Sequence, residues 1–170
     1  MSLSPEIVGE FIDAVVDDEA RARQLLSTYP ELLNARWLHG ETVLHFLAVE
    51  GFIDGVRRLA EWSADVNLVN DFGDPPLRDC VALGNEGLVE LLLQHGANPN
   101  VVSDTLGPLL HAAVASGHAG IVRRLLVAGA DVRACSDSGE TVFDALPTDP
   151  DERDAVLAVL TESGVGPQAG

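Results

Sequence analysis

The side chains with the widest choice of chemistry in this sequence are five histidines and two cysteines, set among 27 aspartate and glutamate residues. Histidine can act as a general base or a metal ligand, and a thiolate can act as a nucleophile. Their spacing forms no zinc motif of closely paired cysteines and histidines. The sequence also contains no nucleotide-binding glycine loop, nucleophile elbow or metalloprotease motif. We therefore expect no catalytic residue, no cofactor and no metal, and we expect that the protein is not an enzyme.

The strong net negative charge of the chain limits the classes of molecule that it could bind. The 170 residues include 10 arginines, no lysine and 27 acidic residues, for a formal net charge of −17. Nucleic acids and anionic membranes are bound through basic surfaces, so neither is expected as a partner. Two cysteines are too few for a disulfide scaffold in a chain this small. With no signal peptide pattern and no apolar run long enough to span a membrane, we expect a cytoplasmic protein.

The same residue types recur every 33 residues, and this period indicates how the chain is organised. Several residue types recur at the same interval in one register. A leucine, a glycine, a valine and an asparagine each return at the same place in successive units. These recurring positions hold Leu44, Leu77 and Leu110; Gly51, Gly84 and Gly117; Val56, Val89 and Val122; Asn34, Asn67 and Asn100.

Each period contains the signals of two helices. Thr42 and Thr141 stand where a hydroxyl would cap a helix N-terminus, and Pro76 suits a first helical turn. The recurring glycines would end the first helix in a left-handed conformation. Apolar residues spaced by three and four follow, which predicts a second helix. One such pair cannot bury its apolar face alone, so neighbouring units must stack to form the core.

The motifs resemble the ankyrin repeat. The segments that carry the resemblance are Gly40-Glu41-Thr42-Val43-Leu44-His45, Pro108-Leu109-Leu110-His111-Ala112-Ala113 and Gly129-Ala130-Asp131. The likeness is strong over residues 37–165 and weak over 4–36. It implies an all-α ankyrin-repeat solenoid of about five helix–turn–helix units with short turns. We expect a single domain over 1–170, with an N-terminal capping unit at 4–36, full repeats at 37–69, 70–102 and 103–135, a C-terminal capping repeat at 136–165 and a frayed tail at 166–170.

The resemblance assigns most of the histidines to the framework. In that family the histidine at the position of His45 and His111 forms hydrogen bonds near the turn and to the next repeat; a metal-ligand role is the alternative. His118 also matches the framework, whereas His39 stands at a predicted turn tip. Cys80 occupies a small-residue position and is expected to be buried.

Ankyrin proteins commonly bind partners through turn tips and first helices, which line a concave face. Phe72 is the residue that folding explains least, because a turn tip should be exposed to water. Packing under the neighbouring turn is the alternative for Phe72, and turn formation is the alternative for the aspartates. Trp37 or Trp62 could add a second aromatic anchor. The predicted partner-binding residues are Trp37, Leu38, His39, Glu41, Glu50, Asp71, Phe72, Asp74, Leu83, Asp104, Thr105, Asp137 and Glu140.

These observations favour a non-enzymatic protein–protein interaction module that binds a basic protein partner through the concave face and turn tips. An acidic mimic of nucleic acid is one alternative. A small-molecule-binding or enzymatic protein is another, which would need His39 with Glu41 or Asp74 and a pocket lined by Phe72 and Leu83. We expect a monomer, and a face-to-face dimer through Phe72 is the alternative.

Overall fold

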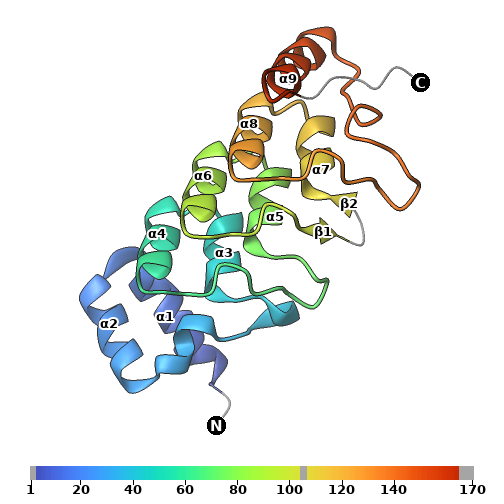
Figure 1. Ribbon diagram of the computed structural model, residues 1–170. Helices are drawn as coiled ribbons and strands as arrows, with labels where there is room; N and C mark the ends of the chain where they lie inside the picture. Colours follow the sequence, from blue (N-terminus) through green and yellow to red (C-terminus); the bar gives the residue numbers. More distant parts are fainter. Residues whose placement is uncertain (1–2, 104–106, 165–170) are drawn as a thin grey trace.

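A computed structural model describes residues 3–103 and 107–164, and the described chain is built mainly from pairs of short helices (Figure 1). The first helices of the three central pairs begin at Val43, Pro76 and Leu109, and the second helices at Ile53, Glu86 and Ala119, which confirms the period read from the sequence. The elements are α1 (Pro5–Asp17), α2 (Glu19–Thr28), η1 (Pro30–Asn34), η2 (Leu38–Gly40), α3 (Val43–Val49), α4 (Ile53–Glu61), α5 (Pro76–Ala82), α6 (Glu86–Gln94), β1 (Val102–Ser103), β2 (Gly107–Pro108), α7 (Leu109–Ala115), α8 (Ala119–Val127) and α9 (Pro150–Glu162).

The helices form two rows. Figure 1 shows α3, α5 and α7 in one row and α4, α6 and α8 in a second, with the connecting turns projecting beside the first row. β1 and β2 pair in antiparallel fashion within one of these turns. The helices α1 and α9 lie at opposite ends of the stack (Figure 1). This is the all-α ankyrin solenoid that the sequence predicts, and the first row with its turns is the predicted binding face.

Thr42 caps α3 as predicted, and His45 completes the cap. The backbone N–H of His45 donates to Thr42 Oγ1 at 3.4 Å, while the Thr42 N–H donates to His45 Nδ1 at 3.1 Å. Reciprocal bonds of this kind satisfy donors that a helix N-terminus leaves unpaired. The other ring nitrogen, Nε2, lies 3.1 Å from the Asp74 carbonyl oxygen, so His45 joins its own unit to the next one.

The predicted framework role of His45 is confirmed, and His111 is also buried and hydrogen-bonded as predicted. His45 is fully buried and His111 is 6% exposed, and His111 Nε2 lies 2.9 Å from the Ala134 carbonyl oxygen. In the intervening unit Arg78 occupies the same position. Its guanidinium pairs with Asp74 at 3.5 Å and with Asp79 at 3.0 Å.

A ladder of asparagines connects successive units along another edge. Asn67 Oδ1 accepts from the Asn98 N–H at 2.8 Å, and its Nδ2 donates to the Gly96 carbonyl at 3.0 Å. Asn100 repeats both bonds one unit later, with Asp131 at 2.7 Å and Gly129 at 3.0 Å. The periodic asparagines therefore have a structural role that fixes the offset between neighbouring units.

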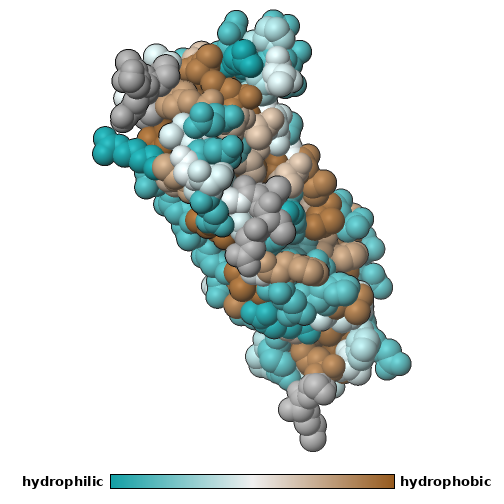
Figure 2. Space-filling model, turned by 90° about the vertical axis from the view of Figure 1, so that its right-hand side faces the viewer, coloured by the Kyte–Doolittle hydropathy of each residue, from teal (hydrophilic) through white to brown (hydrophobic). Residues whose placement is uncertain are grey.

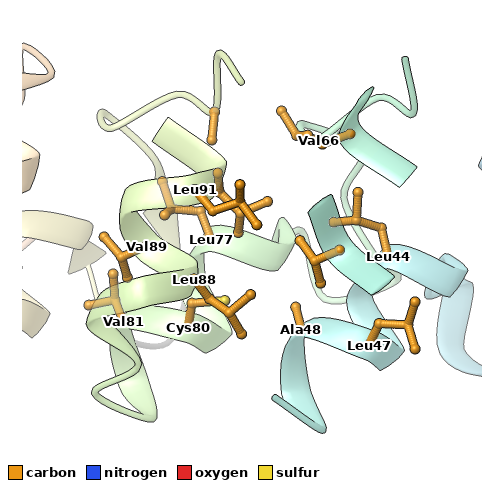
Figure 3. Close-up of a cluster of buried hydrophobic side chains, with 14 of the residues drawn as sticks. Leu44, Leu47, Ala48, Val66, Leu77, Cys80, Val81, Leu88, Val89 and Leu91 are labelled. Atoms are coloured by element: carbon orange, nitrogen blue, oxygen red, sulfur yellow. The ribbon is translucent and has the colours of Figure 1, made fainter. Parts of the chain in front are cut away.

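One continuous core runs through the units and across the junctions between them. Figure 3 shows Leu44, Leu47 and Ala48 of α3 near side chains of α5 and α6, all drawn from one buried hydrophobic cluster. Leu77 and Cys80 of α5 belong to this cluster, and both are fully buried. Burial raises the pKa of the Cys80 thiol to about 12, so Cys80 is a packed thiol and not a nucleophile.

The last unit contains one α-helix among the described residues, and the helix expected after Thr141 is absent. Residues 142–145 form turns instead. The Thr141 hydroxyl and backbone N–H both donate to Asp144 Oδ2 at 2.7 Å, which closes a tight local turn. Pro147 follows, and a proline disfavours helix in the residue before it. The final helix α9 buries Val156, Val159 and Leu160, as predicted.

The buried ring of His45 makes stability depend on pH. Burial lowers the pKa of His45 below its ordinary value of 6.5, because desolvation outweighs the Asp74 carbonyl that favours the charged ring. A lowered folded-state pKa means that the unfolded chain binds the proton more readily. Stability is therefore fully present above pH 6.5 and is lost as pH falls below it. Urea unfolding at pH 7.5, 6.5 and 5.5 should show a falling midpoint for wild type and a flatter series for His45→Gln; equal slopes would contradict this origin.

Candidate protein-interaction surface

The first turn tip, residues 38–41, has an unusual backbone conformation at its centre. His39 and Gly40 both adopt positive φ, 54° and 71°, which folds η2 back on itself. The Trp37 N–H donates to the Glu41 carbonyl at 2.6 Å and closes the turn. Leu38 is thereby turned outward and is 59% exposed. Trp37 is half-buried and packs edge-on against Phe46, with 6.2 Å between ring centroids.

The second turn tip is organised by Asn70, which is buried. Its side-chain oxygen accepts from the Phe72 N–H at 2.9 Å and from the Asp74 N–H at 3.1 Å. An asparagine that bonds ahead to its own backbone in this way shapes a turn without help from the core. Phe72 stands at the summit of this turn and is 62% exposed, as the sequence predicts.

The two tips are joined to each other. The Asp71 N–H donates to the His39 carbonyl at 2.9 Å. The rings of His39 and Phe72 lie 6.1 Å apart between centroids, tilted by 38°. Together with the neighbouring Leu38 they make an apolar surface that we call the tip patch: Leu38, His39 and Phe72.

A second apolar area lies at the far ends of the first-row helices. Val49, at the end of α3, is 43% exposed, and Leu83, just after α5, is 59% exposed. Glu50 is exposed beside Val49. Figure 2, which views the molecule from the right-hand side of Figure 1, shows hydrophobic side chains gathered in separate areas among hydrophilic ones.

Positive charge is sparse on this face, where Arg36 and Arg133 are exposed in the described loops. Within the described chain, the first-row helices α3, α5 and α7 carry a single arginine, Arg78, which is already paired with Asp74 and Asp79. The turn tips 38–41, 71–74 and 137–140 contain no arginine. Most arginines lie instead on the second helices of the units and on α9, namely Arg21, Arg23, Arg57, Arg58, Arg123, Arg124 and Arg153.

Arginines on the second helices are themselves engaged by carboxylates. Arg124 of α8 pairs with Glu90 at 3.1 Å and also with Glu86, both on α6. Arg123 pairs with Glu162 of α9 at 2.6 Å. Four carboxylates on the tips and at the end of α3 are exposed, namely Glu50, Asp71, Asp137 and Glu140. Acidic charge therefore dominates the tip face, whereas the second-helix face has mixed charge.

Asp74 is predicted to be exposed for partner binding, and this prediction is wrong. Asp74 is 6% exposed, because Asn70 and Arg78 draw its backbone and carboxylate into the base of the turn. Trp37 and Glu41 are half-buried. Asp104 and Thr105 lie outside the described residues. The remaining predicted residues are exposed: Leu38, His39, Glu50, Asp71, Phe72, Leu83, Asp137 and Glu140.

Two exposed valines on the turns are missing from the predicted set. Val69 is 39% exposed and Val102 is 61% exposed. They occupy the same position of successive repeats, where Arg36 and Cys135 stand in other units. The arginine at this position in the first unit was the available signal, because a core position would stay apolar throughout.

Other features of the described residues offer less for binding or catalysis. A hollow of about 360 Å³ lies between α6 and α8, lined by Leu93, Val127 and Ala128 together with charged groups, and it includes neither Phe72 nor Leu83. Over residues 3–103 and 107–164, the structure places no histidines, cysteines and carboxylates in groups that could hold a metal ion. None of the helices in those ranges has the length and apolar character needed to cross a membrane.

Comparison with known proteins places this arrangement in context. The family described as "Ankyrin repeats (3 copies)" matches residues 12–103, and the "Ankyrin repeat" family matches residues 108–137. Serine/threonine-protein kinase VIK of Arabidopsis thaliana is 38% identical over 80 residues, which cover 47% of this chain and 18% of the kinase. Neurogenic locus notch homolog protein 1 of Xenopus tropicalis is 38% identical over 56 residues, 33% of this chain and 2% of that protein.

The chain thus spans a small part of the length of these relatives, and the likeness concerns repeat units. Ankyrin repeats generally mediate protein–protein interactions and are typically not catalytic. The evenly spaced helix pairs, the capped first helix with its buried histidine and the two family matches agree with one another. On this evidence the chain belongs to the ankyrin repeat family.

Proposed function

We propose that this protein is a non-enzymatic interaction module that binds a basic surface of another protein through its turn tips and first-row helices. The observation that carries the proposal is the exposure of Phe72 at the summit of a turn built around a buried asparagine. A few exposed aromatic anchors usually supply most of the energy of a protein interface. Asn70 holds the turn in place before any partner arrives, so little ordering cost accompanies binding.

The sign of the partner follows from the distribution of charge. The arginine described on the first-row helices is engaged by two aspartates, and the tips carry exposed carboxylates. Such a face attracts a cationic partner and repels nucleic acid. The proposal includes a monomeric protein that acts in the cytoplasm without nucleic-acid or membrane partners. Its division into capping units at 4–36 and 136–165 around three full repeats is part of the same proposal.

The test is a quantitative affinity purification from the source cells with wild type, Phe72→Ala and Val127→Ala as baits. Val127 is 86% exposed on α8, so its variant removes an apolar surface side chain from the opposite row. We expect a protein that wild type and Val127→Ala retain and Phe72→Ala loses. Binding of that purified protein should weaken by about tenfold or more in Phe72→Ala.

Salt separates this mode from charge mimicry. Binding anchored by apolar side chains should survive a rise from about 150 to about 500 mM salt in measurable form, whereas a mimic of nucleic acid depends on charge alone and loses its affinity. Equal retention by wild type and Phe72→Ala would refute the tip face as the binding surface. A captured protein with an acidic binding surface would refute the predicted sign of the partner.

A further inference from the structure

The tips of the described units differ in kind along the stack. The first and second tips carry the tip patch of Leu38, His39 and Phe72, of which Leu38 and Phe72 are about as exposed as each other at 59% and 62%. The fourth tip, residues 136–140, consists of Ser136, Asp137, Ser138, Gly139 and Glu140. It contains no apolar anchor. Exposed carboxylates therefore occur at both ends of this face, whereas the exposed apolar side chains of the described tips lie at the end formed by the first two units.

The fourth tip is built to hold its charges in place. The Ser136 N–H donates to the Glu140 carbonyl at 2.9 Å, and the Glu140 N–H donates back to Ser136 Oγ at 3.1 Å. The Ser138 hydroxyl donates to the Glu140 carboxylate at 2.9 Å, while Asp137 is exposed. A further carboxylate on this face, Asp144, has its pKa lowered by the Thr141 hydroxyl and backbone N–H. The carboxylates of Asp137, Glu140 and Asp144 thus face solvent at this end.

We propose that the protein recognises a bipartite, extended segment of its partner, in which an apolar or aromatic anchor on the tip patch is followed by a basic cluster on the fourth tip. This inference rests on the proposed function and specifies how the partner is arranged. The occupant follows from charge complementarity: the apolar end has exposed rings, and the other end has carboxylates in a tip that contains no arginine.

The spacing of the two elements follows from the repeat. The second and fourth tips are separated by two steps of the stack, because they occupy the same position in units that lie two apart. Helices that pack side by side lie about 8–10 Å apart, so two steps correspond to roughly 20 Å. A polyproline segment advances about 3.1 Å per residue, and about six residues therefore span about 19 Å. We expect the anchor and the basic cluster to be separated by about six extended residues.

The probes are synthetic fluorescent peptides with a Trp-Leu anchor and four arginines, separated by two, six or ten prolines and made in both chain directions. Proline spacers behave as stiff rods, so a mismatched length cannot place both ends at once. Fluorescence polarisation should show that the six-proline peptide of one direction binds at least about tenfold more tightly than the two- and ten-proline peptides.

Two variants assign the ends of the peptide. Phe72→Ala should remove the dependence on spacer length while leaving weak, salt-sensitive binding. Asp137→Asn with Glu140→Gln should do the same and leave salt-insensitive binding. The matched control is Asp54→Asn with Glu61→Gln, which removes two exposed carboxylates of the same types from α4, on the other row. This control should keep the preference for six prolines.

The outcomes separate the inference from the proposed function. Equal affinity for all spacer lengths, with binding still lost in Phe72→Ala, would overturn the bipartite arrangement and leave the interaction module in place. Equal binding of every arginine peptide by wild type and Phe72→Ala would also overturn it. Failure of all the arginine peptides to bind wild type would overturn both the arrangement and the basic partner.

Discussion

Replacing His45 with alanine is expected to lower the free energy of unfolding by about 3 kcal/mol, because the change opens a cavity and strands buried polar groups. The ring is fully buried, and its two nitrogens contact the Thr42 N–H and the Asp74 carbonyl. Removing it leaves that donor and that acceptor without the ring that bonds them. It also cuts the connection between the α3 cap and the turn that presents Phe72.

The measurement is urea unfolding followed by circular dichroism at pH 7.5, where the neutral ring predominates. His95→Ala serves as the control, because His95 is exposed at the end of α6. The control should shift the free energy of unfolding by less than about 0.5 kcal/mol. A loss in His45→Ala as small as that of the control would show that the buried hydrogen bonds contribute little to the fold.

Replacing Gly40 with alanine is expected to destabilise the protein by more than replacing Gly73, although the two glycines occupy equivalent turn positions in successive repeats. Both have positive φ, 71° and 80°, so each alanine costs about 1–2 kcal/mol in backbone strain. A Cβ at Gly73 meets nothing within 4 Å, whereas at Gly40 it would lie 2.8 Å from Asp71 Cγ and 2.9 Å from the Asp71 backbone nitrogen. Relieving that overlap should cost about 1–3 kcal/mol more.

The comparison isolates the contact between tips, because strain is common to both variants. Chemical unfolding of the two proteins gives the difference directly. Gly40→Ala should also displace Asp71 and so weaken binding at the tip patch, whereas Gly73→Ala should leave the spacing of the two tips intact. Equal destabilisation by the two substitutions would mean that the tips move apart at no cost, contrary to the hydrogen bond between His39 and Asp71.

Much of the fold could be predicted from the sequence, because repeated positions test one another. A glycine at 51 alone is ambiguous, but glycines at 51, 84 and 117 with the same neighbours indicate one turn used three times. Positive φ at all three agrees with that interpretation. The last unit could not be predicted in the same way. Thr141 matches the capping position of Thr42, but Asp144 stands where the other unit has His45. The Thr141 hydroxyl therefore donates to Asp144 and does not cap a helix.

The candidate site also contains both predictable and unpredictable features. The exposure of Phe72 was predictable because a turn tip has few neighbours, and the structure confirms it. The burial of Asp74 was not, because it depends on Arg78 replacing the histidine of other units and drawing the carboxylate inward. A pairing that occurs in one unit leaves no periodic trace in the sequence. The binding roles of these residues remain predictions for the experiments above.

The asparagine ladder has a consequence for how such a chain can change its length. Asn67 and Asn100 each make the same pair of bonds to the following unit, using the same atoms. A duplicated unit would carry both the asparagine and the backbone groups that these bonds need. After a deletion, the remaining neighbours could still form the same pair of bonds. Duplication or loss of the unit between the second and fourth tips would move the acidic fourth tip farther from or nearer to Phe72 by one step of the stack. The number of units would then determine which spacing between anchor and basic cluster a partner must have.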